Sequence, residues 1–278
     1  MPLQRSGKRT AAGSGRGGRA RPGPDSARRD GPRGGSAPKR SPKPAGKPAG
    51  RPVPFRPPLD PPERRRARAE AILSLLRGAF PQAGCALHHR NAYELLVATI
   101  LSAQCTDERV NRVTPTFFGR YPDVGALAGA AQADVEKLIH STGFFRNKAR
   151  SLVGMARLVR DEFAGQIPDT MEGLLRLPGV ARKTANCVLG TWFGRNEGIV
   201  VDTHVGRVAH RLGLTATARN TKDAEKIERD LMELFPRDAW TYLSHALIEL
   251  GRGACRARRP DCPRCPLGPV CPSAGHLN

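Results

Sequence analysis

The residues from 177 to 185 read Leu-Pro-Gly-Val-Ala-Arg-Lys-Thr-Ala, and they separate two segments whose apolar residues recur at helical spacing. Pro178 and Gly179 predict a very tight turn, across which the two helices meet. The second helix then begins with free backbone N–H groups that point forward and suit a phosphate oxygen. A Pro-Gly turn alone would favour an ordinary helix connector, but Arg182 and Lys183 add two cations for which a plain connector has no use.

Helical spacing of apolar residues extends over nearly all of the chain beyond residue 60. A first helix is expected to run to about residue 79, with Asp60 as its cap and Pro61 and Pro62 in its first turn. Further helices are predicted over residues 92–105, 107–119, 132–140, 147–163, 171–177, 182–193, 203–212, 222–235 and 238–250. No segment shows a convincing period of two, which strands require, so the predicted fold class is all-α.

The chain is strongly basic. Its 278 residues include 46 Lys and Arg against 25 Asp and Glu, which gives a formal charge of +21. This balance favours a polyanionic partner, with nucleic acid first, although ribosomal and membrane-surface proteins share it. No apolar stretch is long enough to cross a membrane or to serve as a secretion signal. We therefore expect an intracellular, cytoplasmic protein with no membrane contact.

Residues 1–62 differ in composition from the rest. They hold 14 of the 25 prolines and 11 of the 30 glycines, and their fifteen Lys and Arg less three Asp leave a charge of +12. With almost no apolar side chains to bury, this segment is predicted to be a disordered tail. It can act as a nonspecific DNA-binding arm or be a solvated tail without function. A targeting peptide is disfavoured, because dense prolines forbid an amphipathic helix.

Seven cysteines occur, and four of them crowd near the C-terminus with six, two and five residues between them: Cys255, Cys262, Cys265 and Cys271. An odd count with this clustering favours a metal site in a reducing compartment over a disulfide framework. Zinc and a [4Fe–4S] cluster both accept four thiolates, so chemistry alone leaves both open. The single Cys-x-x-Cys pair is not typical of a zinc ribbon, which has two.

Lys183 lies in the first turn of its predicted helix, where the positive end of the helix dipole disfavours an ammonium. A free lysine amine can form a Schiff base with a carbonyl carbon, and C1′ of an opened abasic deoxyribose is such a carbon. Phosphate contact is the commoner role of a lysine, so on chemistry alone both interpretations stay open. Asp202 precedes a helical run, where it can cap the helix, stabilise an oxocarbenium-like charge, or do both.

Residues 177–185 resemble the helix-hairpin-helix of the endonuclease III family. The resemblance continues through Val201-Asp202-Thr203-His204 and the cysteine cluster, and back to Leu101-Ser102-Ala103-Gln104 and Thr142-Gly143-Phe144-Phe145, so it spans roughly residues 63–273. It implies a bifunctional DNA glycosylase and abasic-site lyase of base excision repair, a monomer in the bacterial cytoplasm, associated with the nucleoid. The implied partner is double-stranded DNA with damaged bases, chiefly oxidised pyrimidines, or with abasic sites.

The resemblance also implies roles for particular residues. Lys183 would attack C1′ of the damaged nucleoside and Asp202 would assist, with strand cleavage by β-elimination. The four clustered cysteines would hold one [4Fe–4S] cluster, whose loop offers arginines to the DNA backbone. The residues expected at the DNA are Gln104, Phe144, Gly179, Ala181, Arg182, Thr184 and His204.

Two loops are expected to enter the duplex, because an evicted nucleotide leaves a gap that a planar or apolar side chain can fill. Gln104 and Phe144 lie where the chain resembles the family's inserting loops. Of the adjacent Phe144 and Phe145, we expect one to lie in the core and Phe144 to be the wedge. Asp107 and His204 are expected to order the site by capping or hydrogen bonding.

The chain departs from the family at Ala181, where Gly-Val-Gly is common. A left-handed backbone there would cost alanine about 1 kcal/mol or more, so we expect the helix to begin at this position instead.

Two helical domains with a basic groove between them are predicted. A six-helix domain, residues 85–195, carries the hairpin, and the first helix, residues 63–84, joins residues 196–278 to form the cluster domain. Two rival functions share the hairpin and the cysteine cluster. An adenine-specific mismatch glycosylase typically lacks the catalytic lysine, so Lys183 disfavours it. A noncatalytic DNA-binding module is disfavoured by the joint occurrence of Lys183 and Asp202.

Overall fold

The computed structural model describes Phe55 and residues 57–277. Every regular element in these residues is helical, and no strand occurs among them, which confirms the all-α prediction. None of the described helices combines the length and the apolarity that a membrane crossing demands. The predicted disorder of the N-terminal tail concerns mainly residues 1–54, which lie outside the described residues.

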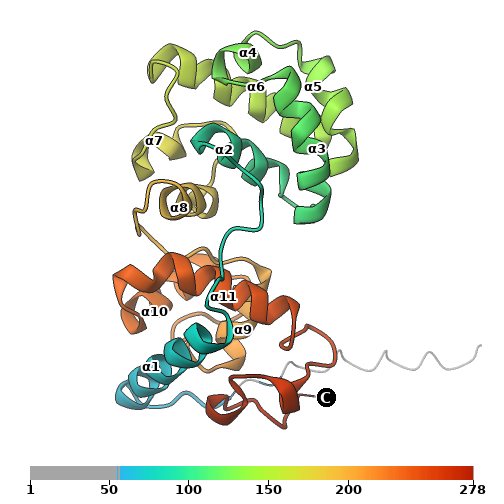
Figure 1. Ribbon diagram of the computed structural model, residues 1–278. Helices are drawn as coiled ribbons and strands as arrows, with labels where there is room; N and C mark the ends of the chain where they lie inside the picture. The colour runs from blue at the N-terminus through green and yellow to red at the C-terminus, as the bar shows by residue number, and fades with distance from the viewer. Residues whose placement is uncertain (1–54, 56, 278) are drawn as a thin grey trace, which may run out of the picture. The chain divides into compact units, whose positions relative to one another are not determined.

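Eleven α-helices make up the described part of the chain, with four short 3-10 helices between and after them (Figure 1). The α-helices are α1 (Pro62–Ala79), α2 (Ala92–Leu101), α3 (Asp107–Arg120), α4 (Val124–Ala128), α5 (Gln132–Ile139), α6 (Phe145–Glu162), α7 (Met171–Leu175), α8 (Arg182–Thr191), α9 (Thr203–Arg211), α10 (Ala224–Leu234) and α11 (Trp240–Arg252). The 3-10 helices are η1 (His140–Thr142), η2 (Arg237–Ala239), η3 (Cys262–Arg264) and η4 (Gly268–Val270).

Helix α4 was missed by the sequence prediction. Its five residues are too few for apolar periodicity to show. Asp123 nevertheless carries a local signal, because its Oδ1 accepts a hydrogen bond from Ala126 N at 2.8 Å and so caps the helix. Two residues of this helix, Val124 and Leu127, are buried, which explains why so short a helix persists.

The predicted cap of the first helix was wrong. Helix α1 starts at Pro62 with Pro61 at the N-cap position, and no side chain caps it. Asp60 instead forms an ion pair with Arg68 two turns further along α1. Proline in the first turn needs no partner for its missing N–H, which makes a capping side chain less necessary.

Two hydrophobic cores organise the described residues. The first core is formed by apolar side chains of α2 to α8 and has Phe117, Leu96 and Met155 among its fully buried members. The second core is formed by α1, α9, α10, α11 and the cysteine loop. The chain passes from the second core to the first after α1 and returns after α8 (Figure 1). The segments that follow α1 and α8 therefore both connect one core to the other.

Candidate active site

The hairpin turn between α7 and α8 has the geometry that its glycine permits. Gly179 adopts a positive φ of 82°, and a Cβ added there would lie 2.7 Å from Cβ of Ser151. Ala181 has an extended backbone, with φ −100° and ψ 170°, and α8 starts at the next residue. The expected absence of a left-handed backbone at Ala181 is therefore confirmed, whereas the helix begins one residue later than expected, with Ala181 at its N-cap.

The N-terminus of α8 is open to solvent. No side chain caps this helix, so its first N–H groups have no side-chain partner. Lys183, the second residue of α8, is exposed, and Thr184 beside it is half-buried. An uncapped helix N-terminus with an adjacent cation is a suitable place for an anion.

Arg182 forms an ion pair with a residue of α10, a helix of the second core. Its Nε donates to Oε2 of Glu228 on α10 at 2.8 Å, and Nδ2 of Asn186 donates to Oε1 of the same carboxylate at 2.8 Å. Glu228 is only 5% exposed. The sequence pattern did not indicate this partner, which lies 46 residues away along the chain. The carboxylate ties α8 of the first core to α10 of the second.

Asp202 caps α9, as one of the two sequence interpretations proposed. Its Oδ1 accepts hydrogen bonds from the backbone N–H groups of His204 and Val205, both at 2.8 Å. The Nδ1 atom of His204 lies 3.2 Å from Nη2 of Arg207, which restrains the imidazole. Asp202 and His204 thus have fixed orientations before any ligand binds.

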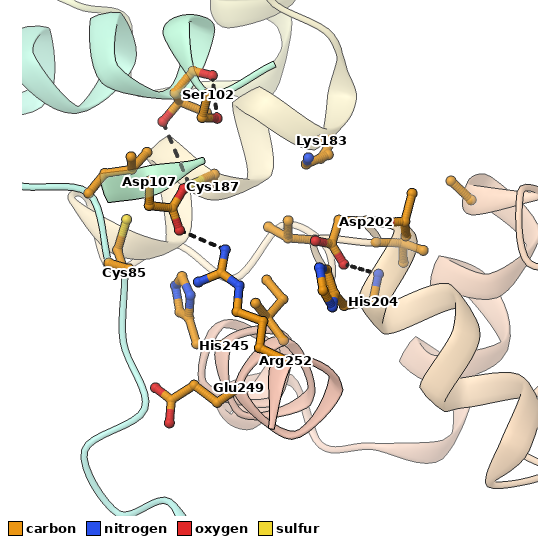
Figure 2. Close-up of a pocket in the computed structure, with 18 of the residues that line it drawn as sticks. Cys85, Ser102, Asp107, Lys183, Cys187, Asp202, His204, His245, Glu249 and Arg252 are labelled. Atoms are coloured by element: carbon orange, nitrogen blue, oxygen red, sulfur yellow. Dashed lines mark hydrogen bonds and ion pairs between the residues drawn. The ribbon is translucent and has the colours of Figure 1, made fainter. Parts of the chain in front are cut away.

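Lys183 and Asp202 line one pocket of about 740 Å³. Figure 2 shows Lys183 on α8 and Asp202 at the start of α9 near each other in this pocket. The walls also include both segments that connect the two cores, near residues 84–87 and 200–203. The structure therefore brings together the two residues that the sequence singled out for chemistry.

Helix α11 supplies a wall of the pocket that the sequence analysis missed. His245, Glu249 and Arg252 all line it, and their spacing of four and then three residues places them on one helix face, a signal that was available in the sequence. Arg252 Nη2 lies 2.6 Å from Oδ2 of Asp107, so Asp107 orders the site through an ion pair (Figure 2). Burial, assisted by the charge of Arg252, lowers the pKa of His245.

Two further cysteines lie at the pocket. Cys85 comes from the segment before α2 and Cys187 from α8. A hydrogen bond from Cys85 lowers the pKa of Cys187 to about 7, against the opposing effect of burial. The same contact, together with burial, raises the pKa of Cys85. The contact between the two thiols therefore shifts their pKa values in opposite directions.

Gln104 and Phe144 occupy the tips of two exposed loops. Gln104 has φ 52° and Phe144 has φ 48°, so both are in the left-handed region. The Phe144 ring is 63% exposed, whereas Phe145 is half-buried against the first core, with its ring centroid 4.5 Å from that of His140. The structure thus separates the two adjacent rings that periodicity could not tell apart.

The four C-terminal cysteines are half-buried in one loop against α9. Arg211 Nη1 lies 3.4 Å from Sγ of Cys255, and Cys271 Sγ lies 3.7 Å from the carbonyl oxygen of Arg211. Arg207 donates to the carbonyl of Cys255 from Nε and Nη2, each at 3.2 Å, and to the carbonyl of Gly251 on α11 at 2.7 Å. Two arginines of α9 therefore hold both ends of the cysteine loop.

Known proteins with similar sequences act in DNA repair. Residues 97–237 match the model of the HhH-GPD superfamily of base excision DNA repair proteins. Endonuclease III of Synechocystis sp. is 53% identical over 210 residues, which cover 76% of this chain and 94% of that protein. Endonuclease III of Bacillus subtilis is 40% identical over 202 residues, which cover 73% of this chain and 90% of that protein. The chain belongs to the endonuclease III family.

A solved structure extends this similarity to three dimensions. A trapped covalent intermediate of endonuclease III with DNA superposes with a TM-score of 0.69 at 39% identity, covering 74% of this chain and 95% of that one. As a member of the endonuclease III family, the chain is a DNA glycosylase with abasic-site lyase activity and acts in base excision repair.

Proposed function

We propose that Lys183 is the nucleophile of the reaction and that Asp202 assists it. The observation that carries this proposal is that both side chains line one pocket from two different helices. The lysine is exposed and belongs to an uncapped helix start, while the aspartate is held by its own cap. That a relative has been solved as a trapped covalent intermediate with DNA supports a covalent route here.

The chemistry follows from the two groups. The Nζ lone pair of Lys183 attacks C1′ as the N-glycosidic bond breaks, and the base leaves with that bonding pair and takes up a proton. Positive charge develops on the sugar, and the carboxylate of Asp202 stabilises it. Displacement leaves C1′ bonded to Nζ and to the ring oxygen O4′; Nζ then gives up its protons, the C1′–O4′ bond breaks with O4′ taking up a proton, and an imine forms. The imine acidifies the C2′ protons, so loss of one expels the 3′ phosphate by β-elimination. Water then releases the sugar fragment and restores the amine.

Double-stranded DNA with a damaged base or an abasic site is the proposed substrate. Relatives have been crystallised with DNA, in covalent and noncovalent complexes. The hairpin would bind the phosphate backbone through free N–H groups near Gly179, Ala181 and Thr184, with Arg182 and His204 alongside. Gln104 and Phe144 would fill the gap that the evicted nucleotide leaves. Oxidised pyrimidines are the proposed lesions.

The cysteine loop is proposed to hold one [4Fe–4S] cluster through Cys255, Cys262, Cys265 and Cys271. All four thiols are free and half-buried within seventeen residues of one loop, and three of them, Cys255, Cys265 and Cys271, pack against the second core. The donor set is all sulfur, which iron–sulfur clusters prefer. The four cysteines would be crosslinked through such a cluster, which would keep the arginines of the loop in position to bind phosphate.

Each hydrophobic core is proposed to be the centre of one domain, with residues 85–195 as the hairpin domain. Residues 63–84 and 196–278 would then form the cluster domain. The protein is proposed to act as a monomer, because one chain supplies both Lys183 and Asp202.

Borohydride trapping tests the role of Lys183. A nucleophilic amine forms an imine with C1′, which borohydride reduces to a stable amine, leaving protein joined to DNA. Lys183→Gln should abolish both the adduct and strand cleavage. Lys222→Gln, which removes another lysine lining the same pocket, should still give the adduct. If Lys183→Gln gives the adduct at the wild-type level, another amine attacks C1′ and the mechanism is wrong.

A further inference from the structure

The two exposed loops that carry Gln104 and Phe144 share an unusual backbone feature. Both residues have a Cβ and yet adopt a left-handed conformation, with φ 52° and 48°. Such a conformation is uncommon for residues other than glycine, asparagine and aspartate, and it persists where the surrounding structure imposes it. Something beneath the two loops must therefore hold them in place.

Lys148, on the first turns of α6, lies beneath both loops. It is only 5% exposed, and its Nζ donates hydrogen bonds to the carbonyl oxygens of Leu101 and Thr142, each at 2.8 Å. Leu101 is the last residue of α2, three residues before Gln104. Thr142 is the last residue of η1, two residues before Phe144. One ammonium group thus joins the two points at which the loops begin.

The contacts of Lys148 differ from ordinary lysine packing. Lysines are almost never fully buried unless they are paired, and here both hydrogen-bond acceptors are backbone carbonyls rather than a carboxylate. Leu101 ends a helix, where the carbonyls lack intrahelical partners and the dipole favours a cation. Without the ammonium, two buried carbonyls would lose their partner, and the two loops would no longer be joined.

We propose that Lys148 is a positioning residue that fixes the separation of Gln104 and Phe144, so that both side chains enter the duplex together. This inference rests on the proposed insertion of the two loops into DNA. Lys148 itself would contact neither DNA nor the reacting atoms. It would act through Gln104 and Phe144, which contact the DNA. Gln104 and Phe144 then work as one unit rather than as two independent contacts.

The test measures insertion directly. A duplex carrying 2-aminopurine opposite the lesion becomes fluorescent as the base loses its stacking partners, so the rate of the signal reports entry of the loops. Lys148→Met keeps the apolar stem of the side chain and removes the ammonium. It should slow the signal by about tenfold in the wild-type background but by less than about twofold when Gln104→Ala and Phe144→Ala are already present.

Controls separate positioning from loss of charge or of folding. Lys137→Met removes a cation from an exposed side chain on α5, whose partner is Asp134, and should leave the signal rate unchanged. Thermal melting shows whether Lys148→Met is folded. If it is not, Lys148→Gln takes its place, because its uncharged amide can still donate a hydrogen bond to a carbonyl. Lys148→Gln is then expected to slow the fluorescence signal more in the wild-type background than in the protein that already carries Gln104→Ala and Phe144→Ala.

The outcomes discriminate between the inference and the function on which it rests. Loss of the Lys148 effect in the doubly substituted loop background supports the inference. An equal slowing in both backgrounds means that Lys148 acts on the fold in general, which overturns the inference and leaves loop insertion intact. A wild-type signal rate in the protein with Gln104→Ala and Phe144→Ala means that the loops do not insert, which overturns both.

Discussion

Asp202 caps α9 and is proposed to assist the reaction, and one substitution can separate these two roles. Its Oδ1 caps α9, and its charge is proposed to stabilise the transition state. Asn is as good an N-cap as Asp, so Asp202→Asn should keep DNA binding and stability, while turnover falls about 100-fold or more through loss of charge stabilisation. Single-turnover kinetics measure the rate and filter binding measures the affinity.

A matched control for this substitution lies at α4. Asp123 also caps a helix with Oδ1, at 2.8 Å from Ala126 N, but it does not line the pocket. Asp123→Asn should therefore change neither rate nor affinity. Equal losses of activity in the two variants would indicate that Asp202 acts only through its cap.

Gly179 is constrained twice, by its backbone and by its neighbour. Its φ of 82° disfavours any side chain, and a Cβ would lie 2.7 Å from that of Ser151. Gly165 has nearly the same φ, 77°, but nothing within 4 Å of the added atom. Gly165→Ala should cost about 1 to 2 kcal/mol of unfolding free energy, and Gly179→Ala clearly more. Urea denaturation of both variants gives the comparison, and equal losses would show that Ser151 moves aside freely.

At the scale of elements, the cysteine loop offers a compositional test. The purified protein should be yellow-brown and contain about four iron atoms per chain. Cys262→Ser should lower the iron content, whereas Cys105→Ser, outside the loop, should not. Metal analysis and visible absorbance measure both. One zinc per chain without visible absorbance would contradict the iron–sulfur proposal.

Long periodic helices were predictable from sequence, because their apolar faces repeat over several turns. The turn at Gly179 and the absence of a left-handed backbone at Ala181 followed from steric rules for single residues. Helix α4 and the partners of Arg182 and Asp107 were not predictable in this way. Ion pairs between Arg182 and Glu228, or Asp107 and Arg252, join residues far apart in the chain, and periodicity carries no information on such pairs.

At the scale of the whole molecule, residues 1–54 carry much of the positive charge of the chain. Residues 1–54 contain fourteen Lys and Arg and two Asp. A variant that lacks residues 1–54 tests their contribution to DNA binding. Phe55 should be kept, because it stacks on His276 with ring centroids 4.8 Å apart. The truncated protein should bind DNA more weakly and with a smaller salt dependence, since fewer counterions are released. Cleavage at saturating enzyme should be unchanged, and its loss would assign the tail a catalytic role.

The passage of the chain between the two cores has a consequence for synthesis on the ribosome. Helix α1 belongs to the second core, yet its partners follow far later: Tyr242 donates to the carbonyl of Phe80 across 162 residues. The first core is complete once α8 has emerged, and it can fold while the chain is still growing. Until α11 has been synthesised, the side chains of Ile72 and Leu76 remain exposed to water. The nascent chain therefore passes through a half-folded stage in which the apolar face of α1 has no partner, and this is the period in which it is most open to chaperones and to aggregation.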